Sequence, residues 1–224
     1  MAASRSYGDP CGIARALDVV GERWALLVVR ELLLGPKRFS DLHRALPGVS
    51  QNVLSHRLRE LTGKGVIRRR RLGPPAGAWV YELTEWGRDL EPVLLGLAAW
   101  GARAPLEVAG ELSPDSMVIA LKTVFDARAA RDLEAEVALR LGDEAFRIRV
   151  MRGVLEVDRA AARPDAVIDT DVATLRSLVF TARPLAEALA TGAVRVEGDR
   201  GLVERFLTLF PRPEPASPGR PGNG

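Results

Sequence analysis

The chain has few of the residue types from which catalytic and metal sites are usually built. Its 224 residues include one cysteine, Cys11, and two histidines, His43 and His56. A single cysteine excludes an intramolecular disulfide, and the histidines and scattered carboxylates show no metal-ligand spacing. A glycine-rich loop of the kind that cradles phosphates is also missing. We therefore expect no enzyme, no cofactor and no bound metal.

Long apolar runs are missing as well. No stretch of about 18 uncharged apolar residues occurs, which argues against a membrane-spanning helix. The first ten residues, MAASRSYGDP, contain no apolar core of the kind found in signal peptides. We therefore expect a cytoplasmic protein with no membrane partner.

Positive charge is abundant, but in one part of the chain only. The net charge is +3, whereas residues 37–71 alone contain ten Lys or Arg and two acidic residues. Residues 111–224 carry sixteen basic and eighteen acidic residues. Such a confined basic excess is typical of a protein in which one domain binds a polyanion.

The basic segment contains the pattern of a helix-turn-helix. Ser40 is expected to cap a short helix, which Pro47-Gly48 then ends. Ser50 is expected to cap a second helix, because it precedes leucines spaced by four and three residues, Leu54, Leu58 and Leu61. The opposite side of this second helix carries hydrogen-bonding side chains that suit base edges and phosphates: Gln51, Asn52, Ser55, His56 and Arg59.

A basic hairpin is predicted directly after this helix. Residues 66–71 (VIRRRR) and 79–83 (WVYEL) read as strands, and the Pro and Gly residues between them form the tip. The arginine fork matches phosphate oxygens, so the hairpin could hold a DNA backbone. The alternative is that the arginine run is only a solvated strand edge. Its position beside a helix-turn-helix favours DNA.

These residues resemble the HxlR family of bacterial winged-helix regulators over about residues 11–101. The matching segments are WALLVVRELLLGPKRFSDLHRALPGVSQNVLSHRLRELTGKGVIRR and YELTEWGRDLEPVLLGLAAWG. The resemblance implies a homodimer that binds double-stranded DNA at an inverted-repeat operator, usually as a repressor, and associates with the nucleoid. The insertion LGPPAGAW departs from the family's wing and makes the wing's groove contact less secure than the helix. The expected DNA-binding residues are Arg38, Ser50, Gln51, Asn52, Ser55, His56, Arg59, Arg68, Arg69, Arg70 and Arg71.

An apolar stripe on the closing helix also favours a dimer. Apolar residues recur there at spacings of three and four: Leu90, Val93, Leu94, Leu97 and Trp100. A small domain would struggle to cover this stripe alone, so a second copy is expected to cover it. Packing of the stripe on the chain's own second domain is the alternative.

Two interpretations of Cys11 are open. In some HxlR-like proteins a cysteine at this place senses oxidants or electrophiles, and here any disulfide would have to form with another molecule. A single cysteine in a cytosolic chain is otherwise an inert, partly buried small side chain. Both readings stay open for this redox candidate.

The second half of the chain reads as a separate α+β domain. The segment 105–114 contains enough Pro and Gly to act as a linker. Alternating apolar residues predict strands around 137–141, 146–150 and 155–157, and amphipathic helices are expected at 172–180, 185–190 and 202–210. The expected divisions are a winged helix-turn-helix domain at 1–104, the linker, a second domain at 115–211 and a disordered tail at 212–224.

The segment from about 111 to 211 resembles the sterol carrier protein type 2 fold. The resemblance rests on the run PDAVIDTDVATLRSLVFTARPLAEALATGAVRVEGDRGLVERFLTLF. It implies an apolar cavity that accepts a hydrophobic small molecule, which could act as an effector. In isolation, the candidate lining residues also read as ordinary core. They are Phe146, Ile148, Val150, Leu178, Leu189 and Phe206.

Two functions follow from these patterns. The first is a ligand-responsive transcriptional regulator. The alternative is a lipid-binding or carrier protein whose winged half serves only dimerisation, a function that would leave the arginine hairpin without a role.

Overall fold

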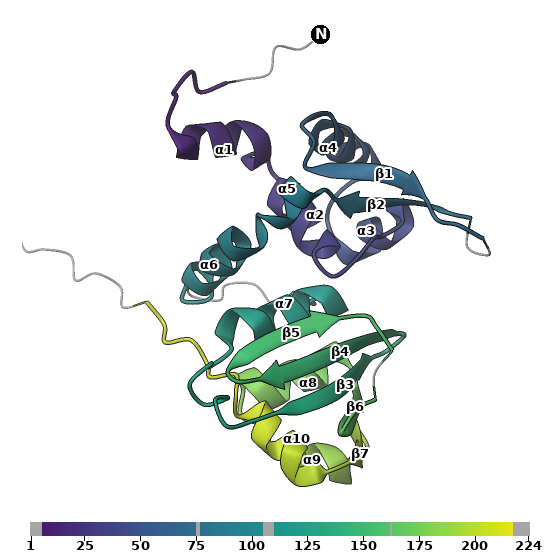
Figure 1. The fold of residues 1–224 in the computed structure, drawn as a ribbon, viewed down its shortest axis with the longest axis vertical. Helices are drawn as coiled ribbons and strands as arrows, with labels where there is room; N and C mark the ends of the chain where they lie inside the picture. Colours follow the sequence, from purple (N-terminus) through teal and green to yellow (C-terminus); the bar gives the residue numbers. More distant parts are fainter. Residues whose placement is uncertain (1–5, 75–76, 105–109, 162, 217–224) are drawn as a thin grey trace, which may run out of the picture. The chain divides into compact units, whose positions relative to one another are not determined.

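The computed structural model describes the whole chain except residues 1–5, 75–76, 105–109, 162 and 217–224. The chain divides into two compact units, residues 1–94 and 95–224. Each unit mixes helices with a β-sheet, so the expected α+β class is confirmed (Figure 1).

Unit 1 is a set of short helices around a two-stranded hairpin. Its strands pair antiparallel, with Ile67 opposite Leu83 and Arg71 opposite Trp79. Its elements are α1 (Gly12–Val20), α2 (Ala25–Leu32), α3 (Phe39–Ala45), α4 (Gln51–Gly63), β1 (Ile67–Arg71), β2 (Trp79–Leu83), α5 (Glu85–Arg88) and α6 (Glu91–Gly101), the last of which continues across the division between the units.

The core of unit 1 joins the helix-turn-helix to the hairpin. The predicted leucine stripe of α4 is buried, and it packs in one cluster with residues of α2, α3 and both strands. The cluster contains Val28, Leu42, Leu58, Ile67 and Leu83, among others. Burial of a leucine or isoleucine side chain contributes about 1.5–3 kcal/mol. This shared core fixes the position of α4 relative to the hairpin.

The two helix starts of the motif differ from each other. The prediction for Ser50 is confirmed, because its hydroxyl accepts a hydrogen bond from the Val53 N–H at 3.3 Å. The prediction for Ser40 was wrong, since α3 already begins at Phe39 and Ser40 lies within the helix. Asp41 instead accepts a hydrogen bond from the Arg38 N–H at 3.2 Å. A carboxylate in the first turn can satisfy the free amide groups there as well as a preceding serine can.

Unit 2 is built on one five-stranded sheet of order β5-β4-β3-β6-β7. β3 and β6 pair in parallel, and the other neighbours pair antiparallel. Its elements are α7 (Pro114–Val124), β3 (Ala135–Leu141), β4 (Glu144–Met151), β5 (Val154–Asp158), β6 (Ala166–Thr170), α8 (Val172–Phe180), α9 (Leu185–Ala190), β7 (Val194–Gly198) and α10 (Arg200–Leu207).

The helices of unit 2 cover one face of this sheet. Figure 1 shows α8 behind the strands and α9 and α10 below them, and alternate strand residues such as Val137, Leu139 and Ile148 are buried. The other face carries paired charges, and the Arg147 guanidinium lies 2.5 Å from the Asp158 carboxylate. The alternation of apolar and polar residues along the strands therefore sorts them between a core face and a charged face.

Aspartate side chains cap two helix starts in unit 2. Asp171 caps α8 and Asp199 caps α10 through side-chain hydrogen bonds to backbone N–H groups. Asp169 precedes Asp171 by two residues but caps no helix, because it lies within β6.

The expected linker and tail are described only in part. Residues 105–109 of the linker and 217–224 of the tail lie outside the described residues. Where the tail is described, the Ala216 N–H donates to the Arg103 carbonyl oxygen at 2.8 Å. The Arg103 side chain in turn donates to the Glu214 carbonyl oxygen at 3.3 Å.

Among the described residues, none of the helices is long and apolar enough to cross a membrane.

Candidate nucleic-acid interface

The polar face of α4 is open to solvent. Gln51, Asn52, His56 and Arg59 are exposed, and Ser55 is half-buried. Ser50 and Arg38, which precede α4 and α3, are exposed as well. The structure therefore gathers these predicted DNA-binding residues at or beside the two helices of the motif.

Two side chains on this face have local partners. The Arg59 Nε–H donates to the Ser55 carbonyl oxygen at 3.4 Å, and His56 Nε2 lies 3.3 Å from Glu60. Val53, which the sequence reasoning passed over because it is apolar, is 41% exposed on the same helix. An apolar side chain at this place can contact a thymine methyl group in the major groove.

Arg57 and Lys64 contribute to the basic excess but face the protein. The Arg57 side chain is 8% exposed, and it pairs with Glu60 and with Glu22. Lys64 Nζ donates to the carbonyl oxygens of Asp18 and Val19, at the end of α1. The count of ten basic residues in this segment therefore overstates the charge that is available to a polyanion.

The four arginines of β1 fall on two faces of the hairpin. Arg68 lies opposite Glu82 in the register, and Arg70 lies two residues further along the same face. The Arg68 Nε–H donates to Glu82 Oε1 at 2.7 Å, and the Arg70 Nε–H donates to Glu82 Oε2 at 2.6 Å. One carboxylate therefore holds two of the four guanidinium groups.

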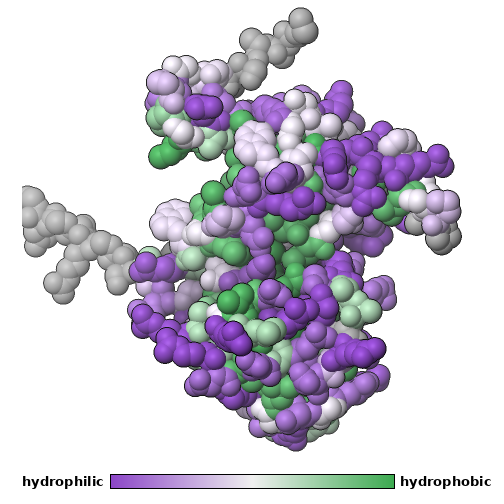
Figure 2. Space-filling view, in the orientation of Figure 1, coloured by the Kyte–Doolittle hydropathy of each residue, from purple (hydrophilic) through white to green (hydrophobic). Residues whose placement is uncertain are grey.

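The other two arginines contact the hairpin near its tip. The Arg69 guanidinium lies 4.6 Å from the centre of the Trp79 ring, and the Arg71 Nε–H donates to the Gly77 carbonyl oxygen at 3.0 Å. Figure 2 shows hydrophilic side chains gathered over this hairpin. Residues 75–76 of the predicted wing tip lie outside the described residues.

Glu82 is a second residue of the site that the sequence reasoning missed. Its side chain is only 9% exposed, whereas those of Arg68 and Arg70 are 63% and 42% exposed. Burial works to raise the pKa of the Glu82 carboxyl, but the hydrogen bonds and charges of Arg70 and Arg68 outweigh it, so this pKa is lowered. The alternation of β2 could have revealed it, because Glu82 is an acidic residue on a strand that faces an arginine run.

Cys11 lies at the start of α1. Its thiol is exposed, and Sγ accepts a hydrogen bond from the Ala14 N–H at 3.4 Å. The second reading expected a partly buried thiol, so the exposure departs from it. Cys11 is the only cysteine of the chain.

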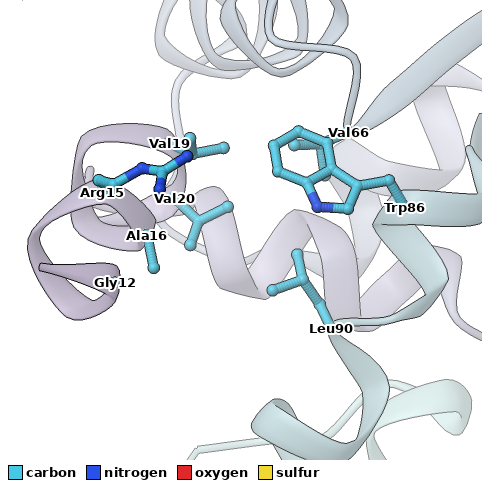
Figure 3. A pocket seen from close by; sticks show the side chains of 8 residues that line it. All are labelled: Gly12, Arg15, Ala16, Val19, Val20, Val66, Trp86 and Leu90. Carbon is cyan, nitrogen blue, oxygen red and sulfur yellow. The ribbon is translucent and has the colours of Figure 1, made fainter. Parts of the chain in front are cut away.

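Unit 1 exposes large apolar side chains on α1, α5 and α6. Ile13 is 75% exposed, Trp86 54% and Val93 58%. A pocket of about 340 Å³ lies between α1 and the region of α5. Figure 3 shows Ala16, Val19 and Val20 on one side of this pocket and Val66, Trp86 and Leu90 on the other.

The stripe predicted on α6 is largely exposed in this single chain. Leu94 is buried and Leu90 is half-buried, whereas Val93, Leu97 and Trp100 are 58%, 47% and 75% exposed.

The candidate ligand-binding residues lie in the core of unit 2. Phe146, Ile148, Val150, Leu178 and Phe206 are buried, and Leu189 is half-buried. A pocket of about 350 Å³ in unit 2 is lined by other residues, which include Leu112, Asp171 and Arg176. The predicted lining residues and this pocket therefore do not coincide.

Comparisons with known proteins match the two units separately. Residues 19–107 match the family model of the HxlR-like helix-turn-helix, and residues 103–216 match that of the alkyl sulfatase C-terminal domain. The chain is 37% identical over 95 residues to the uncharacterized HTH-type transcriptional regulator YdeP of Bacillus subtilis strain 168, which covers 42% of this chain and 74% of YdeP. It is 38% identical over 99 residues to YtcD of the same organism, which covers 44% of this chain and 79% of YtcD.

A crystal structure of the regulator ytcD matches with a TM-score of 0.38 at 39% identity, over 41% of this chain and 94% of that one. The two curated relatives, YdeP and YtcD, show that homologues of unit 1 are HTH-type transcriptional regulators. The chain belongs to the HxlR-like helix-turn-helix family, and its second unit belongs to the alkyl sulfatase C-terminal family.

Proposed function

We propose that this protein regulates transcription by binding double-stranded DNA through unit 1. The observation that carries the proposal is the arrangement of α4 and the hairpin on one shared core, with the polar face of α4 and the arginines of β1 both exposed. Polar side chains on a helix can read base edges, while arginines beside it hold the phosphate backbone.

The proposed contacts on DNA fall into two groups. Gln51, Asn52 and Ser55 read bases from α4, together with His56. The backbone contacts come from Arg38, Arg59 and the β1 arginines 68–71. Ser50, which caps α4, brings the N-terminal turn of that helix to a phosphate.

We propose that the regulator acts as a homodimer on an inverted-repeat operator, as a repressor. The exposed apolar residues of α1 and α6 support a second copy as the partner, because a soluble monomer rarely exposes so many large apolar side chains. A two-fold dimer presents two α4 helices, and each would enter one half-site of a palindromic sequence.

Unit 2 is proposed to sense a hydrophobic small molecule and to have a sterol-carrier-like character. The mixed sheet with helices on one face supports this role, since a ligand could enter between the sheet and the helices. Rearrangement around Phe146, Phe206 and the half-buried Leu189 would then be needed, because the first two are packed in the core. A non-catalytic role for unit 2 stays a prediction.

Binding to the DNA upstream of the protein's own gene tests the proposal. Fluorescence anisotropy with that duplex and with a scrambled duplex of equal length should give an affinity ratio of at least about a thousandfold. Equal affinity for both duplexes, or no binding at low salt, would exclude sequence-specific regulation. Absence of DNA binding together with binding of a lipid extract would favour the carrier function.

A further inference from the structure

Glu82 pairs with Arg68 and Arg70, which lie on the same face of the hairpin, through the same kind of contact. Each guanidinium uses its Nε–H to reach one oxygen of the same carboxylate, at 2.7 Å and 2.6 Å. The Nη groups of Arg68 and Arg70 have no hydrogen-bond or ion-pair partner within the part of the chain that the structure describes.

The difference in burial between Glu82 and the two arginines indicates how their side chains are oriented. The Glu82 side chain is 9% exposed, while Arg68 and Arg70 are 63% and 42% exposed. A buried carboxylate below two exposed guanidinium groups leaves their Nη donors on the solvent side. These donors are the planar edge that binds phosphate oxygens in pairs.

The local charge also fits one phosphate group. Two guanidinium charges and one carboxylate charge leave an excess of one positive charge, and a phosphate diester carries one negative charge. We propose that Glu82, Arg68 and Arg70 form a preorganised phosphate fork, in which Glu82 is the positioning residue and one DNA phosphate binds between the two arginines.

The phosphate fork rests on the DNA binding proposed above, but it makes a separate claim. An acidic residue in a DNA-binding surface normally weakens binding by repelling phosphates. In the fork, Glu82 strengthens binding, because two long side chains that are already held lose less rotamer freedom when the phosphate arrives. The two roles predict effects of opposite sign when the carboxylate is removed.

The first test is Glu82→Gln, with Glu204→Gln on α10 of unit 2 as the charge-matched control. Glu204 is 54% exposed and pairs with Arg200, so its substitution removes the same charge far from β1 in the sequence. The binding constant for a duplex of about 25 base pairs is measured from low to moderate salt. The fork predicts that Glu82→Gln weakens binding by roughly fivefold and lowers the salt slope by about one, although the protein becomes more positive. Tighter binding with a steeper slope would show that Glu82 only neutralises charge, and would overturn the fork.

The second test keeps every charge and both ion pairs. In the double variant Arg68→Lys, Arg70→Lys, each ammonium can still pair with Glu82, but the guanidinium edge is gone. Roughly tenfold weaker binding is expected, against no change for Arg200→Lys, Arg205→Lys in unit 2. Binding equal to that of the unsubstituted protein would overturn the fork.

Two further measurements distinguish a failure of the phosphate fork from a loss of folding or a general absence of DNA binding. The melting temperature of each variant shows whether it is folded, and if Glu82→Gln unfolds, the lysine double variant decides. If the unsubstituted protein binds no duplex at low salt, the proposed function fails and the fork fails with it. If that protein binds and neither variant differs from its control, only the fork is wrong.

Discussion

Arg57 on α4 donates its Nε–H to the carbonyl oxygen of Arg23, which lies between α1 and α2, at 3.1 Å. The side chain also pairs with Glu60 and Glu22 and is almost fully buried. Arg57 therefore holds the proposed recognition helix to the segment that connects α1 to α2. A basic residue in the middle of the proposed recognition helix is here part of the fold.

Arg57→Ala should destabilise unit 1 by about 1.5–3 kcal/mol, because it removes the part-buried hydrogen bond from a charged side chain to the Arg23 carbonyl oxygen. The ion pairs with the more exposed carboxylates of Glu60 and Glu22 add less. Chemical denaturation followed by circular dichroism would measure this. Arg59→Ala, two residues away and exposed, is the matched control. It should leave the stability within about 0.5 kcal/mol of the parent and lower the DNA-binding salt slope by about one. If Arg59→Ala destabilised unit 1 and Arg57→Ala only lowered the salt slope, the placement of these side chains would be wrong.

Substitution of Asn52 should change which sequence is preferred. The side chain is exposed near the N-terminus of α4 and is of a type that pairs with adenine. Asn52→Ala should cost about 1–3 kcal/mol on the parent operator and relax the preference at one base position. Affinities for a set of single-base operator variants would show it. An unchanged ranking of those variants would argue against base reading by this residue.

A charge on the apolar surface of α1 or α6 should break the dimer. Ile13→Glu and Val93→Glu each place a carboxylate where the second copy is expected to pack, so the dimer dissociation constant should rise at least about tenfold. Met151→Glu in unit 2 is the control, since Met151 is also an exposed apolar residue, at 45%. Sedimentation velocity would compare the three. A parent protein that sediments as a monomer would contradict the proposed dimer.

A fall in pH should destabilise the hairpin, because it protonates the Glu82 carboxylate. The pKa of this carboxyl is lowered from 4.5 in the folded chain, so its contribution to stability is present above that value and is lost as the pH falls through the folded pKa. The difference in melting temperature between the parent and Glu82→Gln should therefore be largest above about pH 5 and should shrink below about pH 4. A difference that does not vary with pH would mean that the ionised carboxylate is not what holds the hairpin.

Much of unit 1 could be read from the sequence because its signals are local. Ser50, the leucine spacing and the Pro and Gly residues act within a few positions of one another, and α4 and both strands lie where these residues indicate. The failures involve partners distant in sequence. Arg57 looks like its neighbour Arg59, but it is buried and donates to the carbonyl oxygen of Arg23, which lies 34 residues away. Glu82 lies twelve and fourteen residues from the arginines that it holds.

In unit 2 the strand and helix positions were predictable, but a cavity was not. Alternation marks Phe146 and Ile148 as facing inward without showing whether the space beyond them is filled. The packing of distant helices on the sheet decides that, and no local pattern encodes it.

Hydroxyl-radical footprinting of the protein on the DNA upstream of its own gene tests the central claim most directly. Two copies of α4 in a symmetric dimer should protect two sites on one face of the duplex, with centres about one helical turn of 10 base pairs, or a multiple of it, apart. The protected sites should coincide with the halves of an inverted repeat. A single protected site, or uniform cleavage at protein concentrations that saturate the DNA, would contradict the account.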